Sequence, residues 1–397
     1  MKIGFFGNVN NFPFMLARAI RRAGHEVVFI VGSLQQLDRP EFRYTDVSSV
    51  GTDWIHDVSP FNFWDAAFPT FKRARVVRLL RECDAVILNL SGIALRSYIQ
   101  RPSIALLTGS DIELYATLSY PQQRAFEGRR RPRFIFRALS LFLWNRLVVM
   151  QREGIKNADV VNYIARGLVP EGDGILDDLG VSDSRRIVIL MTDTEDIREA
   201  PAPANRIPRA LCVTRFTWKK PRDPGRSERD YKGSDIMIRG MGLFFRKTGM
   251  RLDVRFGRKG AHVSEAEELT KEEGIADQVT WLEDMSQIQV LEEFRQADFV
   301  LDQFGESIVG MAGLDAMAVG RPLIANWRPE IMDRAVGEVS PVCQARTPEE
   351  VCAQLQRVVL DRGERERIGR ASRLFVEKYF SADAAARLCL SRLARFN

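Results

Sequence analysis

Short apolar runs alternate with amphipathic segments along the first half of the chain. The run KIGFFG at 2–7 ends in a glycine, which is typical of a buried strand. Segment 12–25 has apolar residues at helical spacing and reaches Gly24, and the run at 26–32 again resembles a strand. The same pattern predicts further strands at 84–90, 103–109, 158–164 and 186–192. This alternation is typical of parallel sheets with helices on both faces.

The alternation restarts after 200–210, a segment rich in Pro and Ala that has no periodicity and is the best linker candidate. In the second half, strands are expected at 210–216, 252–257, 279–283, 297–304 and 322–326. Helices are expected at 234–248, 264–274, 286–296, 310–319 and 348–360. The final segment, 370–396, reads as one long helix beyond the second sheet.

These elements predict an α/β chain of two Rossmann-like domains with parallel sheets. We expect an N-terminal domain at 1–203, a C-terminal domain at 204–372, and a helix at 373–397 that packs back toward the first domain. Sites in open parallel sheets lie outside the carboxyl ends of the strands. With two such sheets, the expected active site is a cleft between them.

Composition narrows the classes of function. The 397 residues are 45% hydrophobic and 28% charged, as in a globular protein of about two domains. The net charge of +6 suggests phosphates, nucleotides or anionic lipid headgroups as partners, or simply solvated arginines. Five scattered cysteines and three histidines without metal-ligand spacing argue for a reducing compartment and against a metal site. The first residues lack a signal-peptide pattern, so we expect a cytoplasmic protein.

A glycine-rich turn at 302–320 is the strongest chemical signal. It joins an expected strand to an expected helix, and Asp315 lies one turn into that helix. The unpaired N–H groups of a helix N-terminus bind phosphate, and glycine allows close approach. The Asp315 carboxylate could accept hydrogen bonds from two ribose hydroxyls. Alternatively, the small residues only permit tight packing of the helix on the sheet.

Two motifs carry a resemblance to a known family. DQ at 302–303 and G-x-x-x-x-D-A-M-A-V-G-R-P-L-I at 310–324 resemble the donor-binding signature of retaining glycosyltransferases of family four, which have the GT-B fold. The stretches 231–260 and 272–303 resemble the blocks that precede this signature. The first half is similar mainly in architecture, in its first turn and in TGSD at 108–111.

The resemblance assigns roles to particular residues. It implies acceptor binding by the domain at 1–203, nucleotide-sugar binding by the domain at 204–372, and catalytic roles for Arg215, Lys232 and Asp111. Arg215 and Lys232 would contact the diphosphate, with Lys220 as a rival to Lys232, and Asp111 would contact hydroxyls of the acceptor or the sugar. Asp111 could instead cap the next helix, and either lysine could be merely solvated. The implied donor contacts are Gly7, Asn8, Glu306, Ser307, Ile308, Val309, Gly310 and Asp315.

The chain departs from the family pattern at three positions. Asp315 replaces the usual glutamate, Ser307 replaces an earlier acid, and Thr108 stands where relatives often have a histidine. The turn that contains Gly7 and Asn8 could also be only a tight strand-to-helix connection.

The resemblance implies transfer of a sugar, with retention of configuration, from a UDP- or GDP-type donor to a hydroxyl of a glycan, lipid-linked or small-molecule acceptor. It implies no cofactor, no required metal and no enzyme nucleophile, and by analogy a role in polysaccharide biosynthesis. The alternatives are a nucleotide-sugar epimerase of the same fold and a non-catalytic sugar-nucleotide-binding protein. Nucleic-acid binding is not expected, because no interleaved aromatic and basic motif is present.

The segment at 127–156 mixes arginines with Phe, Leu and Trp. A basic amphipathic segment can lie on anionic lipid, which would suit a lipid-linked acceptor. This reading predicts peripheral contact with the inner face of the membrane through 127–150. The alternative is a buried helix with a charged flank.

Overall fold

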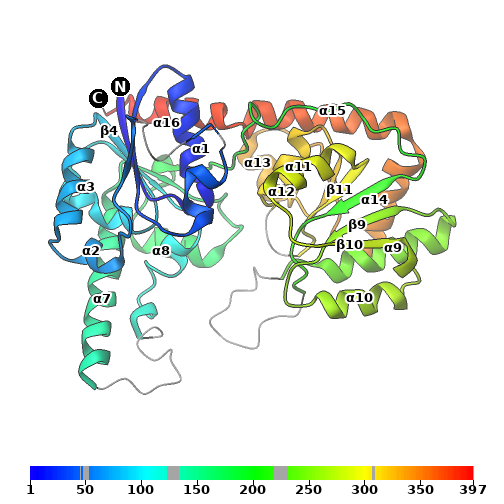
Figure 1. The fold of residues 1–397 in the computed structure, drawn as a ribbon, viewed down its shortest axis with the longest axis horizontal. Coiled ribbons are helices and arrows are strands. Elements are labelled where there is room, and N and C mark those ends of the chain that lie inside the picture. The colour runs from blue at the N-terminus through cyan, green and yellow to red at the C-terminus, as the bar shows by residue number, and fades with distance from the viewer. Residues whose placement is uncertain (45, 48–52, 123–133, 219–230, 306–308, 397) are drawn as a thin grey trace. The chain divides into compact units, whose positions relative to one another are not determined.

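The chain forms two compact units, each with its own parallel sheet (Figure 1). The structure is a computed structural model that describes residues 1–44, 46–47, 53–122, 134–218, 231–305 and 309–396. The first unit comprises Met1–Ile189 and Ala382–Asn397, and the second comprises Leu190–Ser381. The predicted α/β class is confirmed. The first unit ends at Ile189, ahead of the boundary predicted at 203, and the linker candidate belongs to the second unit.

The first sheet has seven strands in the order β3-β2-β1-β4-β5-β6-β7, and its neighbouring strands are parallel. The central strand KIGFF is almost entirely buried, as expected for a parallel strand covered on both faces. The strands are β1 Lys2–Phe6, β2 Glu26–Val31, β3 Ile55–Asp57, β4 Ala85–Leu88, β5 Ser103–Leu106, β6 Val160–Asn162 and β7 Arg186–Ile187.

Helices of the first unit include one from the far end of the sequence. They are α1 Phe12–Arg22, α2 Phe63–Ala67, α3 Phe71–Arg81, α4 Arg96–Ile99, α5 Ser110–Glu113, α7 Phe134–Asn157, α8 Pro170–Asp178 and α16 Ala382–Leu393. Helix α16 packs against α1, and the Nη2 atom of Arg22 lies 2.9 Å from Oδ1 of Asp383. The last residues of the chain therefore complete the first unit.

The second sheet repeats this strand order with six strands, β10-β9-β8-β11-β12-β13, again with parallel neighbours. Its core is rich in phenylalanine and includes the side chains of Phe216, Phe244 and Phe256. The strands are β8 Arg209–Cys212, β9 Asp253–Gly257, β10 Val279–Leu282, β11 Phe299–Leu301, β12 Leu323–Ala325 and β13 Cys343–Gln344.

The helices of the second unit end in a long segment that the sequence pattern mispredicts. They are α9 Ser234–Thr248, α10 Val263–Glu272, α11 Gln287–Gln296, α12 Met311–Ala318, α13 Pro329–Val336, α14 Pro348–Leu360 and α15 Arg362–Tyr379. The single helix expected at 370–396 is wrong, because α15 ends at Tyr379 and α16 starts afresh. Between them the Phe380 carbonyl accepts a hydrogen bond from the Thr192 N–H at 2.8 Å, and Ser381 bridges Thr192.

Candidate functional site

Two polar pairs follow adjacent strands at the carboxyl edge of the second sheet. Strands β8 and β11 are neighbours, although they are far apart in the sequence. Thr214 and Arg215 follow β8, and Asp302 and Gln303 follow β11. The strand order reverses direction between these two strands, and ligands of open parallel sheets bind at such points.

Asp302 joins the two strand ends to the start of α12. Its Oδ1 accepts a hydrogen bond from the Thr214 hydroxyl, and its Oδ2 accepts one from the Gly310 N–H at 3.1 Å. The side chain is only 3% exposed, and this burial raises the pKa of the carboxyl group against the effect of these hydrogen bonds. Asp302 therefore fixes the position of the glycine that begins α12.

Lys232 lies at the same edge, next to Gln303. Its Nζ donates a hydrogen bond to Gln303 Oε1 at 2.9 Å, and its backbone carbonyl accepts one from the Phe304 N–H at 2.9 Å. Gly233 follows in the left-handed region, with φ of +66°. A Cβ atom there would lie 2.6 Å from the Gly305 nitrogen, so only glycine allows this close approach.

The predicted cations come from two segments of the second unit. Arg215 lies three residues after the end of β8 and is exposed, and Lys232 is half-buried. The rival Lys220 lies outside the described residues. The glycine and helix that follow Lys232 favour it over Lys220, and the role of Lys232 stays a prediction. The sequence did not predict that Gln303 accepts its hydrogen bond.

Helix α12 carries the remaining predicted donor contacts. Gly310 is its N-cap in an extended conformation, and Val309 before it is buried. Asp315 is 8% exposed, and its Oδ1 accepts a hydrogen bond from the Thr192 hydroxyl. A ribose contact by Asp315 stays a prediction. The predicted contacts Glu306, Ser307 and Ile308 lie outside the described residues.

Small residues of α12 also serve packing. A Cβ atom on Gly313 would lie 2.8 Å from Asp302 Oδ2 and 2.6 Å from a methyl carbon of Val309. Ala316 and Ala318 are fully buried. The helix therefore lies close against the polar end of β11, and a Cβ atom on Gly310 would lie 3.0 Å from Gln303 Nε2.

In the first unit, Gly7 and Asn8 form the turn after β1. Gly7 has φ of +93°, and a Cβ atom there would lie 2.2 Å from the Asn89 carbonyl oxygen at the end of β4. The Asn8 amide donates to the Asp38 carbonyl at 2.6 Å, and its Oδ1 accepts from the Phe14 N–H at 3.1 Å. These bonds hold the turn, and a donor contact by either residue stays a prediction.

Asp111 is completely buried after β5. Its carboxylate accepts hydrogen bonds from the N–H groups of Thr108 at 2.9 Å and Gly109 at 3.0 Å, and from Asn89 Nδ2 at 3.1 Å. Burial raises the pKa of the carboxyl group, while the hydrogen bonds from Thr108 and Gly109 oppose the shift. In this conformation the carboxylate holds the turn that leads into α5, and its catalytic role stays a prediction.

A cavity of about 450 Å³ lies at the carboxyl edge of the first sheet. Its aromatic wall includes Phe6, Phe61, Phe63 and Tyr115. Polar side chains that line it come from segments after several strands: Asn10, Ser33, Gln35, Asn62, Ser91 and Ser110. Aromatic surface with a few hydroxyl and amide groups suits a small polyhydroxylated molecule. The sequence signalled some of these residues, because Ser33 and Ser91 follow expected strands.

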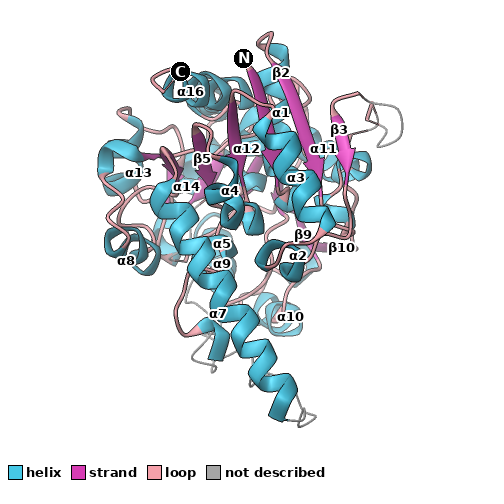
Figure 2. Ribbon diagram, turned by 90° about the vertical axis from the view of Figure 1, so that its left-hand side faces the viewer, coloured by secondary structure: helices cyan, strands magenta, loops and turns pink. Residues whose placement is uncertain are grey.

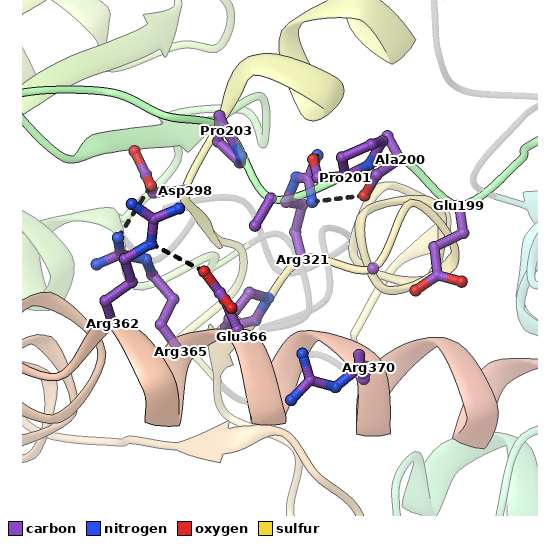
Figure 3. Close-up of a pocket in the computed structure, with 13 residues that line it drawn as sticks. Glu199, Ala200, Pro201, Pro203, Asp298, Arg321, Arg362, Arg365, Glu366 and Arg370 are labelled. Atoms are coloured by element: carbon purple, nitrogen blue, oxygen red, sulfur yellow. Dashed lines mark hydrogen bonds and ion pairs between the residues drawn. The ribbon is translucent and has the colours of Figure 1, made fainter.

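A second cavity, of about 270 Å³, lies at the opposite, amino edge of the second sheet (Figure 3). Arg321 is 2% exposed there, and its guanidinium donates to the carbonyls of Phe294 at 3.0 Å and Pro201 at 2.8 Å. Burial lowers the pKa of Arg321 to about 10. Other charged side chains pair with each other: Arg365 with Asp298 at 3.3 Å, and Arg362 with Glu366 at 2.8 Å. This network supports the fold.

Within the described ranges, no group of His, Cys, Asp and Glu side chains is placed to hold a metal ion. None of the described helices is long and apolar enough to cross a bilayer. All five cysteines are free and buried.

Solved structures identify the fold. The chain is similar to HepE of Anabaena, solved in complex with UDP and glucose, with 12% identity and a TM-score of 0.61 over 100% of both chains. It resembles a glycosyltransferase from Rickettsia africae with 12% identity and a TM-score of 0.61, over 99% of this chain and 97% of that one. It also resembles the lipopolysaccharide outer core galactosyltransferase WaaB, with 14% identity and a TM-score of 0.57 over 100% of both chains.

No protein-family profile matches the sequence, and curated protein sequences contain no significant match. At identities this low, likeness to solved structures shows the fold alone. That fold is GT-B, as predicted.

Proposed function

We propose that this chain is a retaining glycosyltransferase of the family-four type. It moves a sugar from a nucleoside-diphosphate sugar to a hydroxyl group of an acceptor. The observation that carries the proposal is the pairing of Lys232 Nζ with Gln303 Oε1 at the end of β11, beside the start of α12. A cation, a helix N-terminus and a glycine-capped backbone together suit a diphosphate. The likeness to HepE, whose structure contains UDP and glucose, supports this choice of ligand.

Charge stabilisation is the main contribution of the second unit to the proposed reaction. The departing nucleoside diphosphate gains negative charge as its bond to the sugar breaks. Lys232 and Arg215 oppose that charge, and they act more strongly in the transition state than in the ground state. Asp315 accepts hydrogen bonds from the ribose hydroxyls. The acceptor hydroxyl attacks from the face that the diphosphate leaves, and a phosphate oxygen takes its proton, so no enzyme nucleophile or metal is required.

The cavity of the first unit is the proposed acceptor site. Its aromatic wall and polar side chains suit a glycan, a lipid-linked sugar or a small polyhydroxylated alcohol. The buried, free cysteines fit a reducing compartment, which supports a cytoplasmic enzyme.

The test is product analysis with a panel of UDP- and GDP-sugars and mixed acceptor alcohols. We expect release of one nucleoside diphosphate and formation of a glycoside whose anomeric configuration, read by NMR, matches that of the donor. Inverted configuration would contradict the retaining mechanism. A changed sugar without any acceptor would indicate an epimerase. Donor binding with no product from any acceptor would favour a non-catalytic binding protein.

A further inference from the structure

Apolar and basic side chains gather on one side of the first unit. Helix α2 packs against both α3 and α7, and Figures 1 and 2 show all three on the same side of this unit. Phe71 is 86% exposed and Trp64 is 44% exposed. The Phe68 ring lies 4.2 Å from that of Trp64 and 6.2 Å from that of Phe142 on α7. The aromatic–basic face is defined by Trp64, Phe68, Phe71, Arg75, Arg78 and Phe142.

Helix α7 continues this face with an exposed apolar stripe. Leu139, Phe142 and Val149 are 48%, 56% and 58% exposed, and their spacing places them on one side of the helix. Arg146 lies within the same stripe, and its guanidinium stands 5.4 Å from the centre of the Phe68 ring. A water-facing stripe of this kind is unusual for a helix that needs no partner.

The charge of this region is one-sided. Segments 63–81 and 138–152 contain seven basic residues and one acidic residue, and the difference equals the +6 net charge of the whole chain. The acid, Asp65, is 7% exposed and belongs to the capping box of α2. On α3, Phe71, Arg75 and Arg78 are exposed at helical spacing. Apolar and basic groups therefore share one surface.

We propose that the aromatic–basic face docks on an anionic lipid bilayer. The aromatic rings enter the interfacial layer, and the arginines attract acidic headgroups. A second copy of the chain is a poor partner for this face, because two such faces would repel each other. Nucleic acid fits less well, because Leu139 and Val149 would remain in water beside a phosphate backbone.

This surface adjoins the acceptor cavity. Phe63, the first residue of α2, lines the cavity, and the next residue, Trp64, belongs to the aromatic–basic face. A molecule held in the headgroup layer would therefore lie close to the cavity wall. The identity of the acceptor rests on the proposed function. Given that function, the acceptor is an amphiphile whose hydroxyl group is presented at the bilayer surface.

Vesicle flotation of the full chain tests the proposal. We expect flotation with vesicles of phosphatidylglycerol and phosphatidylcholine in equal parts, less flotation with phosphatidylcholine alone, and weakening by salt. The variants Trp64→Ser/Phe71→Ser and Arg75→Glu/Arg78→Glu should each lower the bound fraction at least about tenfold. The matched controls are Ile288→Ser/Val339→Ser, which remove exposed apolar residues of the second unit, and Arg206→Glu/Lys247→Glu, which reverse two exposed charges there.

Three outcomes would overturn the proposal. They are no flotation of the wild type, flotation of the face variants equal to that of the wild type, and equal losses in the controls. Oligonucleotide binding without flotation would point to nucleic acid instead. Thermal stabilisation by UDP and GDP, measured on the same preparations, separates the two claims. Stabilisation without flotation would refute only the docking of the aromatic–basic face on lipid. Flotation without stabilisation would refute only the proposed donor site.

Discussion

The hydrogen bond between Lys232 and Gln303 joins a cation to a neutral acceptor. The nearby carboxylate, Asp302, accepts hydrogen bonds from Thr214 and Gly310, while Lys232 Nζ donates to the Gln303 amide. An amide orients the ammonium group without cancelling its charge. A positive charge held in this way at the end of β11 suits an anion such as a diphosphate.

Replacing this neutral acceptor should weaken the proposed site. Gln303→Glu would create an ion pair with Lys232 and place a negative charge beside the diphosphate. We expect affinity for UDP or GDP to fall at least about tenfold, measured by calorimetric titration. Gln287→Glu on α11 adds the same charge at an exposed position and should leave the affinity unchanged. Equal affinity of the Gln303 variant and the wild type would show that the diphosphate does not approach this pair.

At the scale of elements, the turn between β1 and α1 depends on a single glycine. A side chain on Gly7 must adopt φ of +93° and would meet the Asn89 carbonyl oxygen at 2.2 Å. Gly7→Ala should therefore lower the free energy of unfolding by more than about 2 kcal/mol, measured by urea denaturation. Gly24→Ala is the matched control, since Gly24 has φ of +85° with no atom near its Cβ position. If both variants lost the same free energy of unfolding, the structure around Gly7 would have relieved the contact with the Asn89 carbonyl oxygen.

Arg321 connects the linker, α11 and the start of β12. Arg321→Met would leave buried carbonyls, including those of Phe294 and Pro201, without their hydrogen-bond donor. We expect a loss of about 3 kcal/mol in the free energy of unfolding. Arg370→Met changes an exposed arginine that lines the same cavity and should cost less than about 0.5 kcal/mol (Figure 3). If Arg321→Met lowered the free energy of unfolding by less than about 1 kcal/mol, as an ordinary point mutation does, Arg321 would not have this structural role.

The pattern of apolar residues predicted the long buried strands better than the short ones. β1 and β2 are continuous apolar runs, and parallel strands covered on both faces have that signature. β3 and β13 have only three and two residues, too few to show a period. The helix break at Phe380 depends on a hydrogen bond from Thr192, which is distant in the sequence.

Among the site residues, too, some have a local signal in the sequence and others depend on residues that are distant in the sequence. The family resemblance predicts a role for Lys232, and Gly233 and the helix after it favour Lys232 over Lys220, so this signal is local. The pairing of Lys232 with Gln303, and of Asn89 with Asp111, arises from neighbouring strands whose order a single sequence does not display. Asn89 and Gln303 are polar residues near the ends of expected apolar strands, and that position was the available signal.

At the scale of the whole molecule, the thiols report on the integrity of both units. Burial raises the pKa values of Cys83 and Cys343 to about 11 and those of Cys212 and Cys389 to about 12. Because only the thiolate reacts, these groups should be protonated and inert at pH 8. An aromatic disulfide reagent should titrate fewer than one thiol in the native protein and all five in guanidinium. Rapid reaction of a native thiol would show that its unit opens.

In the proposed reaction, the carboxyl edge of the second sheet binds the diphosphate of a sugar donor. Titration of UDP and GDP into the wild type, Lys232→Ala, Asp315→Ala and the exposed control Lys247→Ala tests it most directly. The account predicts that the wild type and the control bind one of the two nucleotides, and that affinity falls at least about tenfold in both site variants. A wild type that binds neither nucleotide, or a Lys232 variant that binds as tightly as the wild type, would contradict it.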